Sequence, residues 1–283
     1  MQPYLSAWLL TVLCLTLSHA AQAVSASTEQ HFTSDLLRQL PADEILQLSA
    51  EQQQFLLLQR QPMTSYTKGT AILLPDGHEH PASPKHINRL RQQLNDLGWH
   101  TLALMPPQLP ASLAQAETLQ TYQQQLQQRL SAAQQQAQSN PGVIIVIAQG
   151  SSAAIVNQLY ASASLAEPAA FIMLGAYLPD DTLNRDMAKA LATHQVPTLD
   201  ISHDLDNRFV AANLLLRRQL ANKHLKAVYR QRQLTGSGYQ TDVQRQQRWR
   251  RRWSWRPSTP RRIRRWACTT PRSSTRSARS SAA

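Results

Sequence analysis

The regular alternation of short apolar runs with longer amphipathic stretches is the feature that most constrains the fold of this chain. From Gly69 onward the apolar runs have the length of strands, and the stretches between them repeat apolar residues at helical spacing. Strands separated by helices can pair in parallel, with the helices packed on the sheet. We therefore predict an α/β fold with strands at residues 70–74, 101–105, 143–147, 170–174, 198–201 and 225–229, and helices at 84–97, 115–138, 152–163, 182–194 and 208–221.

The run VIIVI at residues 143–147 is apolar at every position, so that both faces of this strand can be buried. Such a strand is typical of the centre of a parallel sheet that helices cover on both faces. We therefore predict that this run is the central strand of a mostly parallel sheet.

The first 23 residues have the pattern of a secretory signal peptide. An apolar run at residues 5–17 is followed by Ala21-Gln22-Ala23, a small-x-small cleavage pattern. The apolar run is shorter than the roughly 20 residues that span a bilayer, so removal is favoured over membrane anchoring. We expect a periplasmic or secreted product with no stable membrane span after the signal is removed.

Residues 24–68 are predicted to form a helical lead-in to the alternating region. Their pattern is polar and helical, and Pro41-Ala42-Asp43-Glu44 has the acidic first turn that favours the start of a helix. This segment is expected to precede an α/β domain at residues 69–240.

The net positive charge of the chain comes entirely from its C-terminal segment. Residues 241–283 contain 13 Arg, no Lys and one acidic residue, Asp242, which accounts for the whole net charge of +12. The other 240 residues carry 16 basic and 16 acidic side chains. The body of the protein is therefore expected to have no nucleic-acid partner.

Three interpretations of this Arg- and Trp-rich tail are open. The segment can bind phosphates or anionic lipid through Arg and Trp. It can also be a disordered extension, which high charge and few apolar residues favour. The third interpretation, an out-of-frame reading of a GC-rich gene, is favoured, because an exported protein rarely meets nucleic acid.

Cysteine and histidine usage excludes several kinds of site. The two cysteines, Cys14 and Cys268, lie in the predicted signal and tail, so the body has no disulfide, catalytic thiol or thiolate metal site. His78 and His80 have a spacing compatible with metal ligation, but no HExxH-type helix surrounds them and a polar loop is favoured. We expect no metal and no cofactor.

The segment TKGTAILLPDGHEHPASPKHINRLRQQLNDLGWHTLALMPPQLP, at residues 67–110, resembles the opening of an α/β hydrolase. In that pattern a strand ends in a small turn, a helix follows, and Gly-Trp introduces the next strand. The resemblance spans roughly residues 34–240 and is closest to an uncharacterised bacterial family of exported α/β-hydrolase-like proteins, known as a domain of unknown function. It implies an α/β-hydrolase-like fold, whose usual last helix is not recognisable in the tail.

The resemblance implies that the loop with Asp76, Gly77 and His78 matches the oxyanion loop of such hydrolases. There, backbone N–H groups stabilise the negative charge that develops on a substrate oxygen. A tight Asp-Gly turn without function is the alternative.

The nucleophile elbow of the family, Gly-x-Ser-x-Gly, matches Ala148-Gln149-Gly150-Ser151-Ser152. This alignment puts Gly150 where the nucleophilic serine belongs. A shift of register by one residue would place Ser151 at the turn instead. The favoured interpretation is a Gly-Ser turn in which Ser152 caps the following helix.

Neither the acid position nor the histidine position of the triad has a convincing match in the sequence. Asp206 matches the acid best, with Asp204 as the alternative, and Asp206 can equally cap the next helix. The loop after the last strand has no histidine, and Tyr239 near the expected position has too high an ordinary pKa, about 10, for a neutral-pH base. His203 and His224 are better interpreted as loop or edge residues.

Three functions follow, in order of preference. The first is a non-catalytic, ligand-binding α/β-hydrolase-like protein whose partner is a small molecule or an envelope component. The second is a periplasmic serine hydrolase, esterase-like, that uses Ser151 with Asp206 as the acid. The third is binding of anionic surfaces or nucleic acid through the tail.

Overall fold

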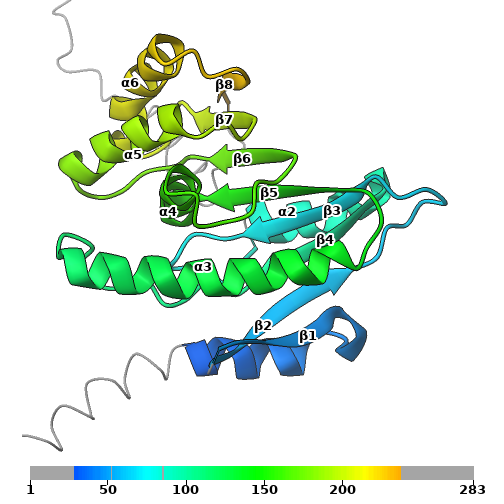
Figure 1. Ribbon diagram of the computed structural model, residues 1–283. Coiled ribbons are helices and arrows are strands. Elements are labelled where there is room, and N and C mark those ends of the chain that lie inside the picture. The colour runs from blue at the N-terminus through cyan, green and yellow to red at the C-terminus, as the bar shows by residue number, and fades with distance from the viewer. Residues whose placement is uncertain (1–28, 52, 85, 237–283) are drawn as a thin grey trace, which may run out of the picture. The chain divides into compact units, whose positions relative to one another are not determined.

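The computed structural model describes residues 29–51, 53–84 and 86–236 (Figure 1). The predicted signal peptide at residues 1–23, the predicted tail at residues 241–283 and Tyr239 lie outside these ranges. None of the helices within the described ranges has both the length and the apolar character needed to traverse a bilayer.

Within the described ranges, eight strands form one sheet in the order β1-β2-β4-β3-β5-β6-β7-β8. The pairs β1–β2 and β2–β4 are antiparallel, and every pair from β4–β3 to β7–β8 is parallel. The mostly parallel sheet predicted from the sequence is thereby confirmed. The strands are β1 (Ile45–Ala50), β2 (Gln53–Arg60), β3 (Gly69–Leu74), β4 (Trp99–Leu104), β5 (Val143–Gln149), β6 (Ala170–Leu174), β7 (Thr198–His203) and β8 (Tyr229–Leu234).

Helices cover both faces of this sheet, as the alternating pattern predicts. Residues 29–39 are helical, and the helices that follow are α2 (His86–Gln93), α3 (Ala116–Gln138), α4 (Gly150–Ala161), α5 (Asp181–Thr193) and α6 (Arg208–Lys223). One hydrophobic core joins the sheet to α3, α4 and α5, and a second joins it to α2 and residues 29–39. Alternate residues of β3 enter the two cores, Ile72 one and Leu73 the other, so this strand is buried on both sides.

The helical lead-in predicted for residues 24–68 is wrong over its second half. The acidic turn after Pro41 forms only a short 3₁₀ helix, Ala42–Glu44, and Ile45 is already extended. The hairpin of β1 and β2 follows it. Leu46, Leu48 and Ala50 alternate with polar residues, a period of two that belongs to a strand with one buried face.

The last strand is displaced from its predicted place at residues 225–229. Leu225 has a positive φ of 53° and is exposed, and β8 begins only at Tyr229. Its sequence, YRQRQL, carries little apolar signal because β8 is an edge strand whose side chains are mostly exposed. The central strand β5 is also less uniformly buried than predicted: Val146 and Ile147 are buried, whereas Val143 is half exposed.

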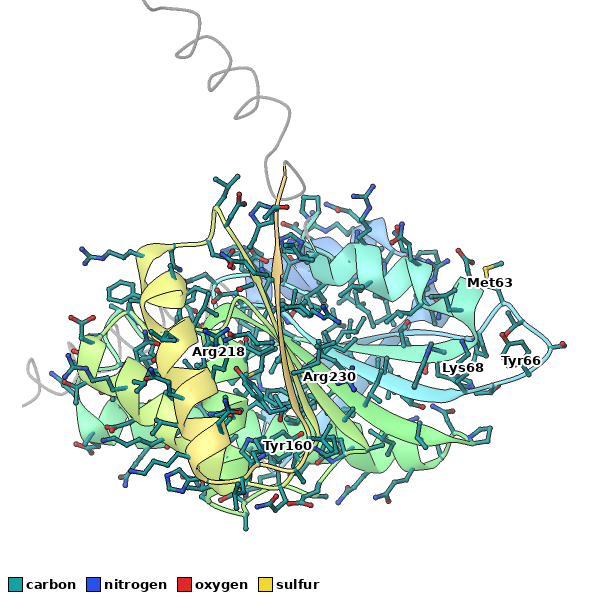
Figure 2. All side chains as sticks on the ribbon, turned by 90° about the horizontal axis from the view of Figure 1, so that it is seen from above. Met63, Tyr66, Lys68, Tyr160, Arg218 and Arg230 are labelled. Atoms are coloured by element: carbon teal, nitrogen blue, oxygen red, sulfur yellow. The ribbon has the colours of Figure 1, made fainter. Side chains whose placement is uncertain are left out.

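The loop between β2 and β3 lies at the amino edge of the parallel strands. Figure 2 shows its side chains Met63, Tyr66 and Lys68, of which Met63 and Tyr66 are exposed. The loops that carry the predicted site residues follow the carboxyl ends of the strands instead. That edge is where ligands bind in open α/β sheets.

Candidate active site

Three loops that are far apart in the sequence meet at the carboxyl edge of the sheet. They follow β3, β5 and β6, whose parallel register brings their ends together. The backbone N–H of Tyr177, after β6, points to the carbonyl of Gly150 at 3.4 Å. The Ser151 hydroxyl meets Asp76, after β3, across 75 residues of sequence. The predicted oxyanion loop and elbow are therefore neighbours in space.

The elbow is a sharp turn from β5 into α4, and Gly150 occupies its apex. Gln149 is extended, and Gly150 has a φ of +58°, the left-handed region that favours glycine. A Cβ atom on Gly150 would lie 2.0 Å from Asp76 Oδ2 and 2.7 Å from Asp76 Cγ. The place of a nucleophile's side chain is thus filled by the carboxylate of Asp76.

Ser151 lies one position inside α4, and its hydroxyl is fully engaged. Ser151 Oγ donates to Asp76 Oδ1 at 2.6 Å and accepts from the Gly77 N–H at 3.3 Å. The residue is only 1% exposed. Gly77, predicted to supply an oxyanion-hole N–H, is consequently directed at this serine.

Ser152 does not cap the helix, which corrects the sequence-based interpretation. The helix begins at Gly150 with Gln149 as its N-cap, so Ser152 lies inside the first turn, completely buried. Burial raises the pKa of the neighbouring Tyr122 hydroxyl far above its usual range, although its contact with Ser152 acts in the opposite direction. Tyr122 therefore stays protonated at neutral pH. Sequence reasoning missed this residue, which lies one turn before Leu126 on the apolar stripe of α3.

The surroundings of the elbow are acidic. Gln149 Nε2 donates to Glu79 Oε2 at 3.4 Å, and His78 between Asp76 and Glu79 is exposed. Burial and the charges of Asp76 and Glu79 raise the pKa of Tyr177. Carboxylates at this position oppose the build-up of negative charge on a substrate oxygen, which an oxyanion hole must favour.

His78 and His80 do not form a metal site with their neighbours. The ring of His80 packs against Phe32, with 5.1 Å between the ring centroids. No group of three or more metal-ligating side chains comes together anywhere in the described part of the chain.

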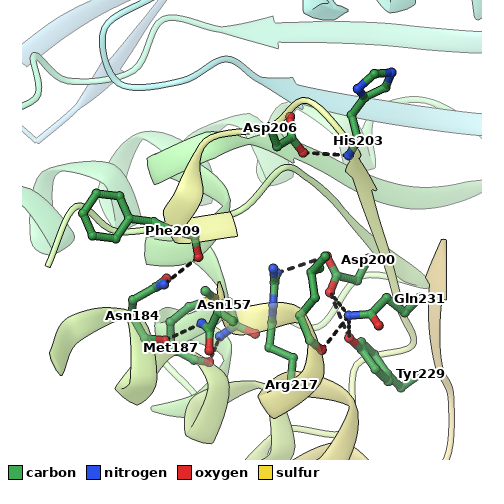
Figure 3. A network of polar contacts seen from close by, with 12 residues as sticks. Asn157, Asn184, Met187, Asp200, His203, Asp206, Phe209, Arg217, Tyr229 and Gln231 are labelled. Carbon is green, nitrogen blue, oxygen red and sulfur yellow. Dashed lines mark hydrogen bonds and ion pairs between the residues drawn. The ribbon is translucent and has the colours of Figure 1, made fainter. Parts of the chain in front are cut away.

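Asp206 lies in the turn after β7, close to the carboxyl edge. Its Oδ2 accepts from the backbone N–H of His203 at 2.7 Å, and it approaches Gly175 after β6. The helix cap belongs to Asn207 instead, whose Oδ1 accepts from two N–H groups of α6. Figure 3 shows that the His203 ring points away from the Asp206 carboxylate.

The other candidate acid, Asp204, is held within the same turn. Its Oδ1 lies 2.9 Å from His203 Nδ1, and the Leu205 N–H donates to the same nitrogen at 3.0 Å. The His203 side chain is 2% exposed. Asp204, Asp206 and His203 therefore make contacts that shape the turn between β7 and α6.

The fold is similar to that of solved α/β hydrolases. Est1E from Butyrivibrio proteoclasticus superposes with a TM-score of 0.54 at 11% identity, over 74% of this chain and 97% of that one. The carboxylesterase Cest-2923 from Lactobacillus plantarum WCFS1 gives 0.53 at 14% identity, over 74% and 95%. An alpha-beta serine hydrolase homologue from Coxiella burnetii gives 0.50 at 14%, over 70% and 89%. At such identities the likeness concerns the fold alone.

Sequence comparison adds the family. Among curated proteins, none matches the sequence. The family described as "Protein of unknown function (DUF3530)" matches residues 16–118 and 110–256, which together are most of the chain and include the whole described sheet. The chain therefore belongs to this family of unknown function, and its described domain has an α/β-hydrolase-like fold.

Proposed function

We propose that this protein binds a ligand at the carboxyl edge of its α/β-hydrolase-like sheet without hydrolysing it. The observation that carries this proposal is the Asp76 carboxylate at the apex of the elbow, where a Cβ atom on Gly150 would overlap it. The N-terminal signal pattern supports export, so the ligand would be a small molecule or an envelope component.

A serine hydrolase needs three things that this elbow does not combine. The nucleophile must project from the apex, a base must accept its proton, and N–H donors must face the developing oxyanion. Here the apex residue is glycine, and Ser151 Oγ is the group that the Gly77 N–H contacts. A binding function needs none of these arrangements.

Esterase activity through Ser151 is the second candidate, because its hydroxyl already donates to a carboxylate at 2.6 Å. Asp76 would then take the proton that the resemblance to hydrolases assigns to a histidine. The nearly complete burial of Ser151 opposes this candidate, since an ester carbonyl must approach the attacking oxygen.

We expect the purified protein to hydrolyse nitrophenyl acetate no faster than buffer and to resist labelling by a fluorophosphonate. The assay should include Ser151→Ala and, as a matched control, Ser162→Ala at the exposed far end of α4. Labelling that Ser151→Ala abolishes and Ser162→Ala preserves would establish the esterase and overturn the binding proposal.

The steric conflict at the elbow can be measured separately. Gly150→Ala should destabilise the protein by about 1–2 kcal/mol for the left-handed conformation and by a further 1–3 kcal/mol for the overlap with Asp76. Introduced into the Asp76→Ala variant, Gly150→Ala should add only the conformational cost. Denaturant unfolding of the two single variants and the double variant gives the coupling. Strictly additive losses would show that Asp76 does not fill the apex.

A further inference from the structure

A large cavity lies beside the predicted oxyanion loop, where Leu109 and Tyr122 of its lining approach Gly77, and four separate elements wall it. Its volume is about 1210 Å³, above the usual range for small-molecule sites of about 300–1,000 Å³. Residues 29–39, the β1–β2 hairpin, the loop after β4 and the amino-terminal half of α3 all contribute side chains. Tyr122 lines it, and the Tyr122 hydroxyl also reaches the predicted oxyanion loop, 2.9 Å from where a Cβ atom on Gly77 would lie.

The walls of this cavity are rich in amides and hydroxyls. Thr118, Thr121 and Gln125 follow one face of α3 at intervals of three and four residues. Each of the four walls contributes at least one glutamine: Gln30, Gln47, Gln53, Gln54, Gln108 and Gln125. An amide group donates and accepts hydrogen bonds at once, as a sugar hydroxyl does.

The charges of the lining are nearly all compensated internally. Arg129, which is 4% exposed, forms a two-pronged ion pair with Glu29, at 2.7 Å and 3.1 Å. Its Nε–H has no hydrogen-bond partner among the described residues and remains a buried donor in the wall. Glu117 is the other ionisable acid of the lining, so no positive charge is left over for an anionic ligand.

We infer that this cavity binds a neutral saccharide. Paired donors and acceptors on every wall match an uncharged ligand with many hydroxyls, and Leu37, Leu109 and Pro110 offer apolar surface to the C–H faces of sugar rings. A peptide would bring a terminal carboxylate and acidic side chains for which the lining has no free positive charge. The inference rests on the proposed binding function and names its ligand class.

The test is calorimetric titration of the full chain with two neutral trisaccharides, chitotriose and cellotriose, and with unblocked trialanine, whose terminal carboxylate has no free counter-charge in the lining. We expect at least one trisaccharide to bind and the peptide not to bind. The double variant Gln54→Ala/Gln125→Ala should weaken the binding roughly tenfold or more, because each lost amide removes hydrogen bonds to the ligand. Gln124→Ala, an exposed neighbour of Gln125 outside the cavity, is the matched control and should bind like the unaltered protein.

Failure of both trisaccharides to bind at millimolar concentration would overturn the inference, as would peptide binding alone or equal losses in Gln124→Ala and the double variant. These outcomes are distinct from those of the ester assay. An active esterase that binds a trisaccharide keeps the ligand class and loses the non-catalytic function. A protein that is inactive as an esterase and binds neither trisaccharide keeps the non-catalytic function and loses the ligand class.

Discussion

Replacement of Asp200 by alanine is expected to lower the free energy of unfolding by about 3–5 kcal/mol, a large part of a typical total of about 5–15 kcal/mol. Asp200, on β7, and Arg217, on α6, are both completely inaccessible to solvent. Removal of the carboxylate leaves the guanidinium as an unpaired charge in the interior. The loss of stability is therefore the cost of burying an unpaired guanidinium, which is larger than the net stabilisation that the ion pair provides.

Figure 3 shows the polar contacts around this pair, in which Asp200 is the acidic partner of Arg217. Arg217 Nη1 donates to Asp200 Oδ1 at 3.1 Å, while its Nε and Nη2 find no partner among the described residues. Tyr229 and Gln231 of β8 donate to Asp200 Oδ2 at 2.8 Å and 3.2 Å. Burial and the charge of Asp200 raise the pKa of Tyr229, so it remains a donor.

Two further variants separate charge from packing, with stability measured by urea unfolding. Asp200→Asn keeps the shape and loses the charge, so it should destabilise the protein nearly as much as Asp200→Ala. Asp186→Asn breaks an ion pair with Lys189 on the exposed face of α5 and should cost less than about 1 kcal/mol. Similar small losses in all three variants would contradict the assignment of a buried, uncompensated Arg217.

Sequence patterns locate the strands that are buried and miss those that are not. The strands β3, β5 and β6 carry apolar runs because helices cover both faces of the sheet, and the predicted places of all strands from β3 to β7 agree with the structure to within a few residues. At the edge, β8 is exposed and mostly polar. In β1 only alternate residues are apolar, and the acidic turn before them suggested a helix.

The candidate site was predictable as a location but not as an arrangement. The register of the run at residues 143–147 places Gly150 at the end of the strand, and the structure has it at the apex of the turn. That the Asp76 carboxylate enters the same space depends on the direction of one side chain from a loop 75 residues away. No local sequence pattern predicts where the Asp76 side chain points. The Asp200–Arg217 pair is hidden for the same reason, since a polar residue in a predicted strand gives no sign of its partner.

Acid is expected to destabilise the protein through His194, which ends α5 and is 4% exposed. Asn157 Nδ2 donates to Met187 O at 2.9 Å, so the Asn157 Oδ1 faces His194 Nε2 at 3.0 Å as an acceptor. His194 Nε2 must then carry the proton. Its Nδ1 is left to accept from Lys226 Nζ at 3.2 Å. The neutral imidazole satisfies both neighbours, whereas a proton on Nδ1 would face an ammonium group.

Burial and the charge of Lys226 accordingly lower the pKa of His194 from 6.5 to about 3. Above pH 6.5 the imidazole is neutral in the folded and unfolded states, and it contributes no pH dependence. Between pH 6.5 and pH 3 the unfolded chain takes up a proton that the folded protein refuses, so stability falls as the pH falls. The full loss across this window is roughly 4–5 kcal/mol. Lys226, whose pKa is lowered by burial to about 8, is protonated in both states below pH 7 and does not add to the loss.

Carboxylates titrate in the same window, so the contribution of His194 must be isolated by comparison. His194→Gln keeps one donor and one acceptor but cannot take up the proton. Between pH 6.5 and pH 4.5 the unaltered protein should therefore lose about 2–3 kcal/mol more than this variant in urea unfolding. His224→Gln, at the exposed end of α6, is the matched control for the exchange itself. Parallel stability curves for His194→Gln and the unaltered protein would show that the buried imidazole takes up its proton in the folded state after all, with Asn157 and Lys226 rearranged around it.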